Sequence, residues 1–273
     1  MQIESQVPVS VIIPCFNCEG TIIRAVNSIF NQTLQPNEVI LIDDGSTDES
    51  LSKLNEIRDH LGPSWIRVLK LDNNKGPSAA RNAGWNVAAQ PYLAFLDADD
   101  IWHPCKIEIQ LKCMQDHPEL AITSHFFSWL RDGENPPPLK DNCTIKPITK
   151  RMVLASNQLA TPTVMLKRNL EFRFEPDKRY SEDYLLWLRI ICNKYHAANI
   201  ELCMAYSYKP PYGSSGLSAQ LWDMEIGELD TYRRLRDDRL ISWPWYIALS
   251  TFSMIKYVRR TMISAQRGIY DEA

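Results

Sequence analysis

Short apolar runs alternate with stretches of helical spacing over roughly the first hundred residues, and this alternation limits the possible folds most strongly. The runs occupy residues 9–13, 39–42, 66–71 and 92–96. Between them, apolar side chains recur every three or four positions, which indicates amphipathic helices. Strands that alternate with helices join through right-handed crossovers into a mainly parallel central sheet flanked by helices. The sequence therefore predicts an α/β fold whose ligands bind beyond the carboxyl ends of the strands.

Three carboxylates follow the fourth run within four positions: Asp97, Asp99 and Asp100. Like charges this close raise one another's pKa, so a bound divalent cation is the simplest partner that would keep them ionised. Oxygen ligands at a strand end suit Mg²⁺ or Mn²⁺, with substrate phosphates and water completing the coordination. An acidic turn before the helix expected at residues 104–116 would explain the same residues. Taken alone, this motif leaves both interpretations open.

Polar loops follow all four runs, at residues 14–19, 43–46, 75–81 and 97–100. Pro14 cannot donate a ladder hydrogen bond, and we expect it to end the first strand. Because the carboxyl ends of parallel strands meet at one edge of a sheet, the four loops are predicted to share one rim.

The pattern changes after residue 116. Short strands are predicted at 121–129, 163–167 and 197–206, and a helix is predicted to begin after Ser181. Ser181 is placed to cap this helix, and Asp183 in its first turn would favour the positive end of the helix dipole. Small residues in the stretch 208–216 are typical of a mobile loop, which beside a charged rim is a candidate lid. Residues 218–268 read as two helices.

Composition limits the partners and the compartment. The chain of 273 residues is 45% hydrophobic and carries a formal net charge of −3 with a pI near 6.0, which gives no general attraction to nucleic acid. Cys15 and Cys18 form a C-x-x-C, for which redox or zinc chemistry is an alternative, but no second pair stands at a zinc-site spacing. We expect reduced thiols and a cytoplasmic chain, with no secretory signal and no transmembrane run.

Five motifs in order resemble those of the inverting glycosyltransferases of family 2, which have the GT-A fold. They read VIIPCFN at 11–17, DDGSTD at 43–48, GPSAARNAG at 76–84, DADD at 97–100 and ED at 182–183. The resemblance implies a GT-A domain over residues 1–218, in which residues 1–103 bind a nucleotide sugar and residues 104–218 bind an acceptor. Residues 219–273 would form a helical C-terminal extension.

The resemblance also implies the reaction, which transfers a sugar from a nucleotide diphosphate donor, here a UDP-sugar, to an acceptor hydroxyl with inversion. Asp43 would hydrogen-bond the base. The donor pocket would further include Pro14, Phe16, Glu19, Lys75, Gly76, Arg81 and Asp97. The first three of these would line the nucleoside, the next three would approach the nucleotide or its phosphates, and Asp97 would hold the ribose or an outer-shell water.

Two carboxylates would carry the chemistry by this resemblance. Asp99 would ligate the Mn²⁺ or Mg²⁺ that bridges the diphosphate and stabilises its developing charge. Asp183 would act as the general base that takes the proton of the acceptor hydroxyl, and Glu182 would orient the loop. No covalent nucleophile is needed, because a single in-line displacement inverts the sugar.

Two departures from the family pattern bear on function. Lys209 stands in a stretch where many relatives carry an Arg or His that meets the diphosphate or the metal. A lysine supplies the charge but not a bidentate fork. The Gln-x-x-Arg-Trp motif of polymerising members is absent, which favours a single-addition transferase in polysaccharide or glycoconjugate biosynthesis.

Two other functions remain as alternatives. A phosphatase of the haloacid dehalogenase type also places Asp-x-Asp after an apolar strand, but normally on its first strand and with Thr or Val where Ile101 stands. A non-catalytic module that binds a sugar nucleotide would lack the base or the metal carboxylate, whereas Asp183 and Asp99 are both present. Release of phosphate, or tight donor binding without turnover, would distinguish these alternatives.

The C-terminal segment 240–258 combines aromatic and aliphatic residues with Lys256, Arg259 and Arg260 close to its end. Rings beside cations suit a membrane interface. We therefore expect either a peripheral contact with the inner face of the membrane, near a glycan or lipid-linked acceptor, or a helix that packs on the catalytic domain or forms a homodimer.

Overall fold

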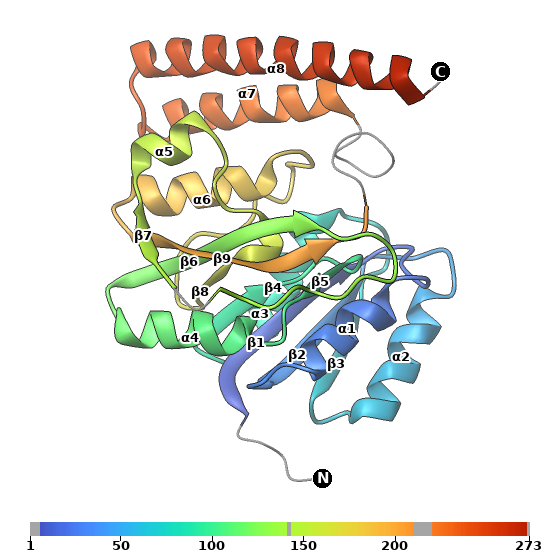
Figure 1. Cartoon of the computed structure of the whole chain (residues 1–273). Coiled ribbons are helices and arrows are strands. Elements are labelled where there is room, and N and C mark those ends of the chain that lie inside the picture. The colour runs from blue at the N-terminus through green and yellow to red at the C-terminus, as the bar shows by residue number, and fades with distance from the viewer. Residues whose placement is uncertain (1–5, 141–142, 210–219, 272–273) are drawn as a thin grey trace.

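The computed structural model describes residues 6–140, 143–209 and 220–271, with the side chains of the last helix described as far as Met262. Within these residues one sheet of nine strands crosses the molecule, and helices cover both of its faces (Figure 1). The strands are β1 (Val7–Cys15), β2 (Pro36–Asp43), β3 (Ile66–Lys70), β4 (Tyr92–Phe95), β5 (Asp100–Trp102), β6 (Leu120–Trp129), β7 (Ile145–Ile148), β8 (Met165–Lys167) and β9 (His196–Ser207). The helices are α1 (Ile22–Phe30), α2 (Ser50–Leu61), α3 (Pro77–Val87), α4 (Lys106–Asp116), α5 (Lys150–Ala155), α6 (Glu182–Cys192), α7 (Leu221–Asp237) and α8 (Trp243–Asp271), with a 3-10 turn η1 (Thr161–Thr163).

The strand order is β3-β2-β1-β4-β8-β6-β9-β5, and β7 pairs with β9. The first four strands in this order are parallel: Ile12 lies opposite Ile40 on one side and Phe95 on the other. β8 is antiparallel to β4 and to β6, so the sheet is mixed beyond β4. The predicted α/β fold with a helical C-terminal extension is confirmed.

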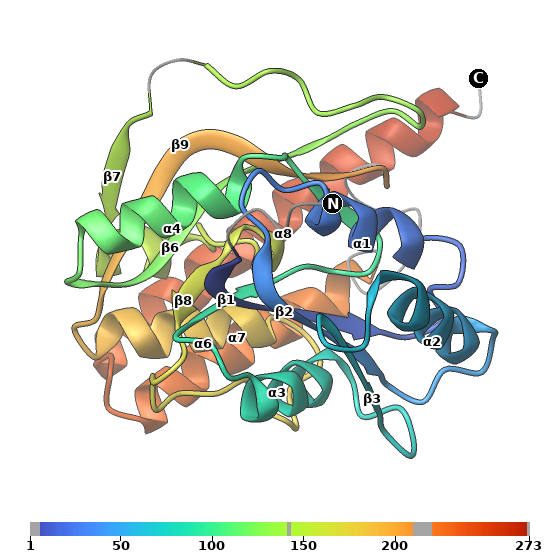
Figure 2. The same ribbon diagram turned by 90° about the horizontal axis from the view of Figure 1, so that it is seen from below.

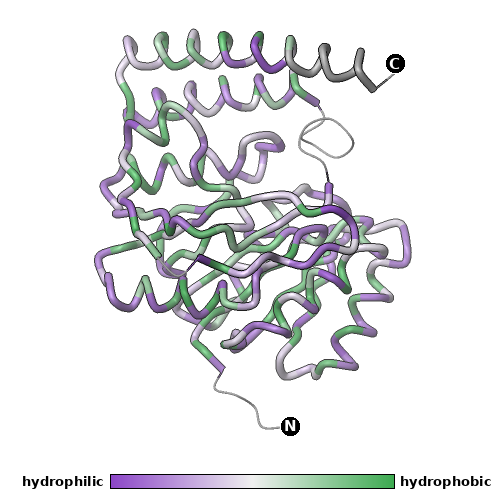
Figure 3. Tube along the Cα trace, in the orientation of Figure 1, coloured by the Kyte–Doolittle hydropathy of each residue, from purple (hydrophilic) through white to green (hydrophobic). Residues whose placement is uncertain are grey.

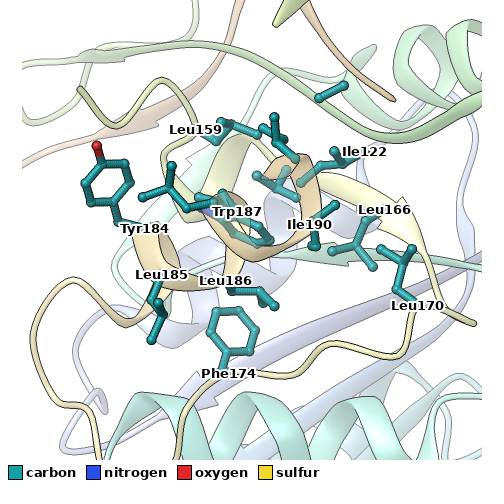
Figure 4. Close-up of a cluster of buried hydrophobic side chains, with 14 of the residues drawn as sticks. Ile122, Leu159, Leu166, Leu170, Phe174, Tyr184, Leu185, Leu186, Trp187 and Ile190 are labelled. Atoms are coloured by element: carbon teal, nitrogen blue, oxygen red, sulfur yellow. The ribbon is translucent and has the colours of Figure 1, made fainter. Parts of the chain in front are cut away.

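Strand alternation divides the core between two faces of the sheet. Ile12 and Ile40 belong to a cluster with Trp187 of α6, whereas Val11 and Leu41 belong to a second cluster with Ile29 of α1. Successive strand residues point to opposite faces, so continuous apolar runs are what a sheet covered on both sides requires. Viewed from below, α1, α2 and α4 lie on the near side of the sheet (Figure 2). Figure 4 shows the first cluster around Trp187, where Phe174 and Leu186 converge.

Pro14 does not end the first strand, which continues to Cys15. The backbone of Ile12 faces β4, because its carbonyl accepts the N–H of Leu96 at 3.1 Å, and the carbonyl of Cys15 faces the β2 side, where it accepts the N–H of Asp44 at 2.8 Å. Successive residues of a strand direct their backbone polar groups to opposite sides, so the backbone of residue 14 points toward β4, as that of residue 12 does. The β1–β4 pairing has already ended at Ile12 and Phe95, so the missing N–H of Pro14 loses no ladder bond.

Some local predictions were wrong. The strand predicted at 163–167 begins only at Met165, because Thr163 ends η1, and the short elements β5, β7 and α5 were not predicted. β7 is mostly exposed and carries no alternating apolar pattern, which explains why periodicity missed it. Ser181 does occupy the N-cap position of α6, but its backbone is left-handed, with φ 55°, and its side chain makes no capping hydrogen bond.

The last two helices pack in layers over α6 (Figure 1). Tyr232 and Leu235 of α7 and Leu249 of α8 belong to the same hydrophobic cluster as Trp187. Figure 3 shows hydrophilic and hydrophobic bands alternating along α7 and α8. No helix in the described part of the chain has the length and apolarity needed to cross a bilayer. Most of the stretch predicted as a lid, residues 210–216, lies outside the described residues.

Candidate functional site

A cavity of about 370 Å³ opens beyond the carboxyl ends of β1 to β4. This is the rim that the sequence predicted, and residues from all four loops meet there. The lining residues are Pro14, Cys15, Phe16, Asn17, Cys18, Thr21, Asp44, Asn74, Gly76, Pro77, Arg81, Asp97, Ala98, Asp99, Arg179 and Lys209. The cavity therefore combines an apolar aromatic side chain, Phe16, with carboxylates and cations from distant parts of the chain.

Six of the predicted donor and metal residues line this cavity: Pro14, Phe16, Gly76, Arg81, Asp97 and Asp99. The Phe16 ring is 46% exposed, which leaves a face open for stacking on a flat ligand. The thiols of Cys15 and Cys18, also in the lining, are free and form no disulfide in the structure.

Three other predicted residues face different partners. Buried Asp43 accepts the N–H of Ser46 at 3.3 Å and braces its own turn. The Oε2 atom of Glu19 accepts the N–H of Glu49 at 2.9 Å, directly before α2. Lys75 is exposed and does not appear in the lining of the cavity.

Asp44 lies in the cavity wall although the sequence interpretation had selected its neighbour, Asp43. Its two carboxylate oxygens accept the N–H groups of Lys75 and Gly76, each at 2.8 Å. Burial raises the pKa of Asp44, and these two hydrogen bonds oppose the rise. Asp44 therefore holds the turn before α3, in which Gly76 adopts φ 86°. The two adjacent acids before Gly45 indicate in the sequence that an acid stands at this position of the cavity wall. They do not indicate which of the two faces the cavity.

Arg81 connects the loop after β4 to helix α6. It is 5% exposed, and it donates from Nη2 to Oδ1 of Asp97 and from Nη1 to Oε1 of Glu182, both at 2.8 Å. Burial by itself would lower the pKa of Arg81, but the two carboxylates outweigh it and raise the pKa further. The guanidinium is therefore permanently charged, and it joins the loop after β4 to the start of α6.

Asp183 stands one residue beyond Glu182, outside the cavity lining. Its Oδ2 atom accepts hydrogen bonds from Thr161 at 3.2 Å and Asn157 at 3.3 Å, and its Oδ1 atom accepts the N–H of Tyr184 at 2.6 Å. Burial raises the pKa of Asp183, whereas Arg81 and these donors act to lower it. Burial likewise raises the pKa of Glu182. A carboxylate with a raised pKa and fixed orientation has the properties of a general base.

The three carboxylates after β4 have separate environments. Asp97 is bonded to Arg81, and Asp100 is buried where β5 pairs with β9. Asp99 is partly exposed in the cavity, as Asp97 is, but its Oδ2 atom lies 2.6 Å from Nζ of Lys209. Within the described residues no group of three or more potential ligands is arranged around a metal position. Mg²⁺ and its analogues are commonly held by one or two carboxylates plus substrate phosphates, so Asp99 fits a cation that is completed by a diphosphate.

Arg179 is the cavity cation that sequence reasoning missed. It is exposed on the loop between β8 and α6, which carries no motif and no apolar period. Only the packing of this loop on α3 brings it to the rim; Ser78, for example, donates to the carbonyl of Lys178 at 3.1 Å.

A larger cavity of about 490 Å³ lies elsewhere, between α3, the loop at 171–176 and α6. Its principal cation, Arg189, is already bonded to Glu175 at 2.6 Å and to Asp238 at 2.8 Å. The charge of Arg189 is therefore compensated within this cavity, and six of the predicted site residues line the smaller one.

Comparison with known proteins gives the family of the chain. Residues 10–168 match the model of glycosyl transferase family 2. The chain is 33% identical over 217 residues to the Escherichia coli UDP-Glc:alpha-D-GlcNAc-diphosphoundecaprenol beta-1,3-glucosyltransferase WfaP, covering 76% of this chain and 78% of that one. It is 31% identical to WfgD of the same organism and of the same named activity, covering 79% of this chain and 84% of WfgD.

The fold is shared with solved glycosyltransferase structures. S. aureus TarS in complex with UDP-GlcNAc superposes with a TM-score of 0.65 at 20% identity, over 83% of this chain and 66% of that chain. The mannosyltransferase PcManGT from Pyrobaculum calidifontis, in complex with GDP-Man and Mn²⁺, has a TM-score of 0.64 at 15% identity, over 97% and 81% of the two chains.

The strand-end cavity, the arginine that links its two carboxylate groups and the match over more than half of the chain lead to one conclusion. The chain is a glycosyltransferase and belongs to glycosyl transferase family 2.

Proposed function

We propose that this enzyme transfers a sugar from a UDP-sugar to an acceptor hydroxyl with inversion, with residues 1–103 binding the donor and residues 104–218 the acceptor. The observation that carries the proposal is the Arg81 bridge. It couples Asp97, beside the metal carboxylate Asp99, to Glu182, beside the base Asp183. One guanidinium thus aligns the donor side and the acceptor side of the site.

The donor would lie in the cavity beyond β1 to β4. Phe16 and Pro14 form its apolar wall for the nucleoside. By the family motif, Asp43 and its neighbour Asp44 are the acids that would approach the nucleobase. Glu19 and Lys75 would have to change their side-chain orientations to reach the nucleotide. Arg179 and Lys209 would supply positive charge to a diphosphate bound beside Gly76.

Asp99 would hold a Mn²⁺ or Mg²⁺ ion together with the diphosphate. When bound, this cation neutralises charge that develops on the leaving group. The ammonium group of Lys209 would compete with this cation for Asp99, because it already lies 2.6 Å from Oδ2.

Asp183 would take the proton of the acceptor hydroxyl while the hydroxyl oxygen forms a bond to C1 of the donor sugar. The bond between C1 and the diphosphate oxygen breaks on the opposite face, and its electron pair leaves with the nucleoside diphosphate. Thr161 and Asn157 orient the carboxylate by donating to Oδ2. The product has the inverted anomeric configuration.

The acceptor that we propose is a lipid-linked sugar diphosphate, with a soluble glycan as the alternative. WfaP and WfgD, both above 30% identity and of similar length, are named for glucose transfer to GlcNAc-diphosphoundecaprenol. A named teichuronic acid glycosyltransferase, TuaG of Bacillus subtilis, is 29% identical over 87% of this chain. We infer a cytoplasmic enzyme at the inner face of the membrane, active in polysaccharide or glycoconjugate biosynthesis, with UDP-glucose as the first donor to test.

The test combines binding and turnover. UDP affinity is measured by calorimetry in Mn²⁺ and in EDTA for the wild type, for Asp99→Ala and for Asp59→Ala, which removes an exposed carboxylate at the end of α2. We expect Asp99→Ala to weaken UDP binding only when Mn²⁺ is present, and Asp59→Ala to leave it unchanged. Transfer from UDP-glucose to a synthetic GlcNAc-diphospholipid is then followed by mass spectrometry. Equal UDP affinity with and without metal in the wild type would refute metal-dependent donor binding, and failure with every UDP-sugar would refute the donor class.

A further inference from the structure

The outer side of α8 is apolar and uncovered in the described chain. Six large side chains, each at least 45% exposed, form what we call the α8 outer face: Trp245, Ile247, Phe252, Ile255, Val258 and Met262. Helical spacing places five of them on one side of the helix, away from buried Leu249 and Ser253, and Trp245 stands at the edge of this side. α8 packs on α7, which in turn packs on α6, so this face is turned away from the molecule (Figure 1).

The charge of α8 points to an anionic partner. No Asp or Glu occurs from Ile241 to Tyr270. Two of its cations are already compensated by α7, because Lys256 is bonded to Glu228 at 2.6 Å and Arg260 to Glu225 at 2.7 Å. Arg259 is exposed beside the apolar residues. The outer face therefore combines large apolar area with positive charge and no acidic group.

The charge of the face does not suit a homodimer. Symmetric pairing of two such faces would bring together helices without acids to match their cations, because neither carries an Asp or Glu from Ile241 to Tyr270. A bilayer surface needs no complementary acid on a second helix.

We propose that the α8 outer face docks on an anionic lipid bilayer, with the helix lying in the plane of the interface. The apolar side chains enter the boundary between headgroups and acyl chains, Trp245 lies at headgroup level, and Arg259 meets lipid phosphate. The helix lies on the membrane and does not span it, in agreement with its modest hydropathy. This orientation turns the α6 side of the molecule, with Asp183, toward the membrane.

The proposal deepens the proposed function, on which it rests for the lipid-linked acceptor, but its test needs no catalysis. The intact chain is sedimented with vesicles of phosphatidylglycerol and phosphatidylethanolamine, and separately with vesicles of phosphatidylcholine. The test variant combines Phe252→Asp with Ile255→Asp. The control combines Phe126→Asp on β6 with Ile145→Asp on β7, which makes the same two changes at other exposed positions.

We expect the wild type and the control to partition into the anionic pellet. The α8 variant should lose about ten-fold or more of this partition, because two large apolar side chains that would move from water into the bilayer are replaced by aspartates. Thermal unfolding verifies that both variants remain folded, as expected for exposed positions. Equal sedimentation of wild type and α8 variant would overturn the proposal. So would equal loss in the control, or a wild type that stays in solution and dimerises through α8 by light scattering. UDP binding is measured on the same samples. It tests the proposed function independently of whether the chain binds vesicles.

Discussion

Lys209 neutralises Asp99: its ammonium nitrogen, from a residue just beyond β9, lies 2.6 Å from the carboxylate that would ligate the metal. Removal of this lysine should raise the affinity of the free enzyme for Mn²⁺. We expect Lys209→Ala to tighten Mn²⁺ binding by up to about five-fold, because an exposed ion pair contributes about 0.2–1 kcal/mol. Electron paramagnetic resonance of free Mn²⁺ measures the change without any turnover.

Lys53→Ala serves as the control for this experiment, since Lys53 forms an exposed pair with Glu56 at 2.7 Å outside the cavity. Its Mn²⁺ affinity should match that of the wild type. An unchanged affinity in Lys209→Ala would mean that the contact between Lys209 and Asp99 does not oppose metal binding.

Asp183→Asn tests the base. The variant should retain UDP affinity and lose about 10²- to 10⁴-fold in kcat, because the amide still accepts the hydrogen bonds of Thr161 and Asn157 but cannot take a proton. The wild type should lose activity as the pH falls through the pKa of Asp183, which burial raises above the ordinary value of 3.8. A pH profile of kcat/KM measures this limb. Near-normal turnover by Asp183→Asn would leave this residue with a purely structural role at the start of α6.

Arg81→Ala should destabilise the protein strongly. It leaves Asp97 and Glu182 without their shared cation, and loss of one partner from a buried pair typically costs about 3–5 kcal/mol. Arg58→Ala removes an exposed arginine bonded to Asp59 and should cost less than about 1 kcal/mol. Urea unfolding followed by tryptophan fluorescence compares the two. Similar losses in both variants would contradict the bridging role of Arg81.

Lys106→Met should stabilise the protein. Lys106 is fully buried, its Nζ atom has no hydrogen-bond partner among the described residues, and it lies 3.7 Å from the centre of the Trp102 ring. An unpaired buried polar group costs about 1–3 kcal/mol, so we expect a gain of that order. Lys112→Met, an exposed position on the same helix, should change the free energy of unfolding little.

The same lysine gives a pH dependence of stability. Burial lowers the pKa of Lys106 well below its ordinary value of 10.5, so the unfolded chain binds this proton more tightly than the folded chain. The free energy of unfolding contributed by this group therefore rises with pH between the lowered pKa and about 10.5. Urea unfolding across that range should show the slope in the wild type and Lys112→Met but not in Lys106→Met. Destabilisation by Lys106→Met would mean that the amine is satisfied in solution.

By itself, the sequence determined the first four strands, their helical crossovers and the polar rim at the strand ends. These follow from local periodicity and from Gly, Pro and Asp at turns, which act within a few residues. The family motifs also singled out Arg81, Asp97 and Asp183. Their mutual geometry was not predictable, because the bond from Arg81 to Glu182 spans a hundred residues of chain and exists only after α3 and α6 pack.

Only the tertiary structure decided several other features. Adjacent acids look alike in sequence, yet Asp44 rather than Asp43 lines the cavity, because the turn at 75–76 offers it two N–H donors. Pro14 was predicted to end a strand, and it is tolerated because the strand beside it ends first. The sequence predicted an aromatic, basic C-terminal helix, but which of its residues face water depended on α7 covering Leu249 and Ser253. Patterns along the chain specify elements, whereas partners and exposure depend on which elements become neighbours.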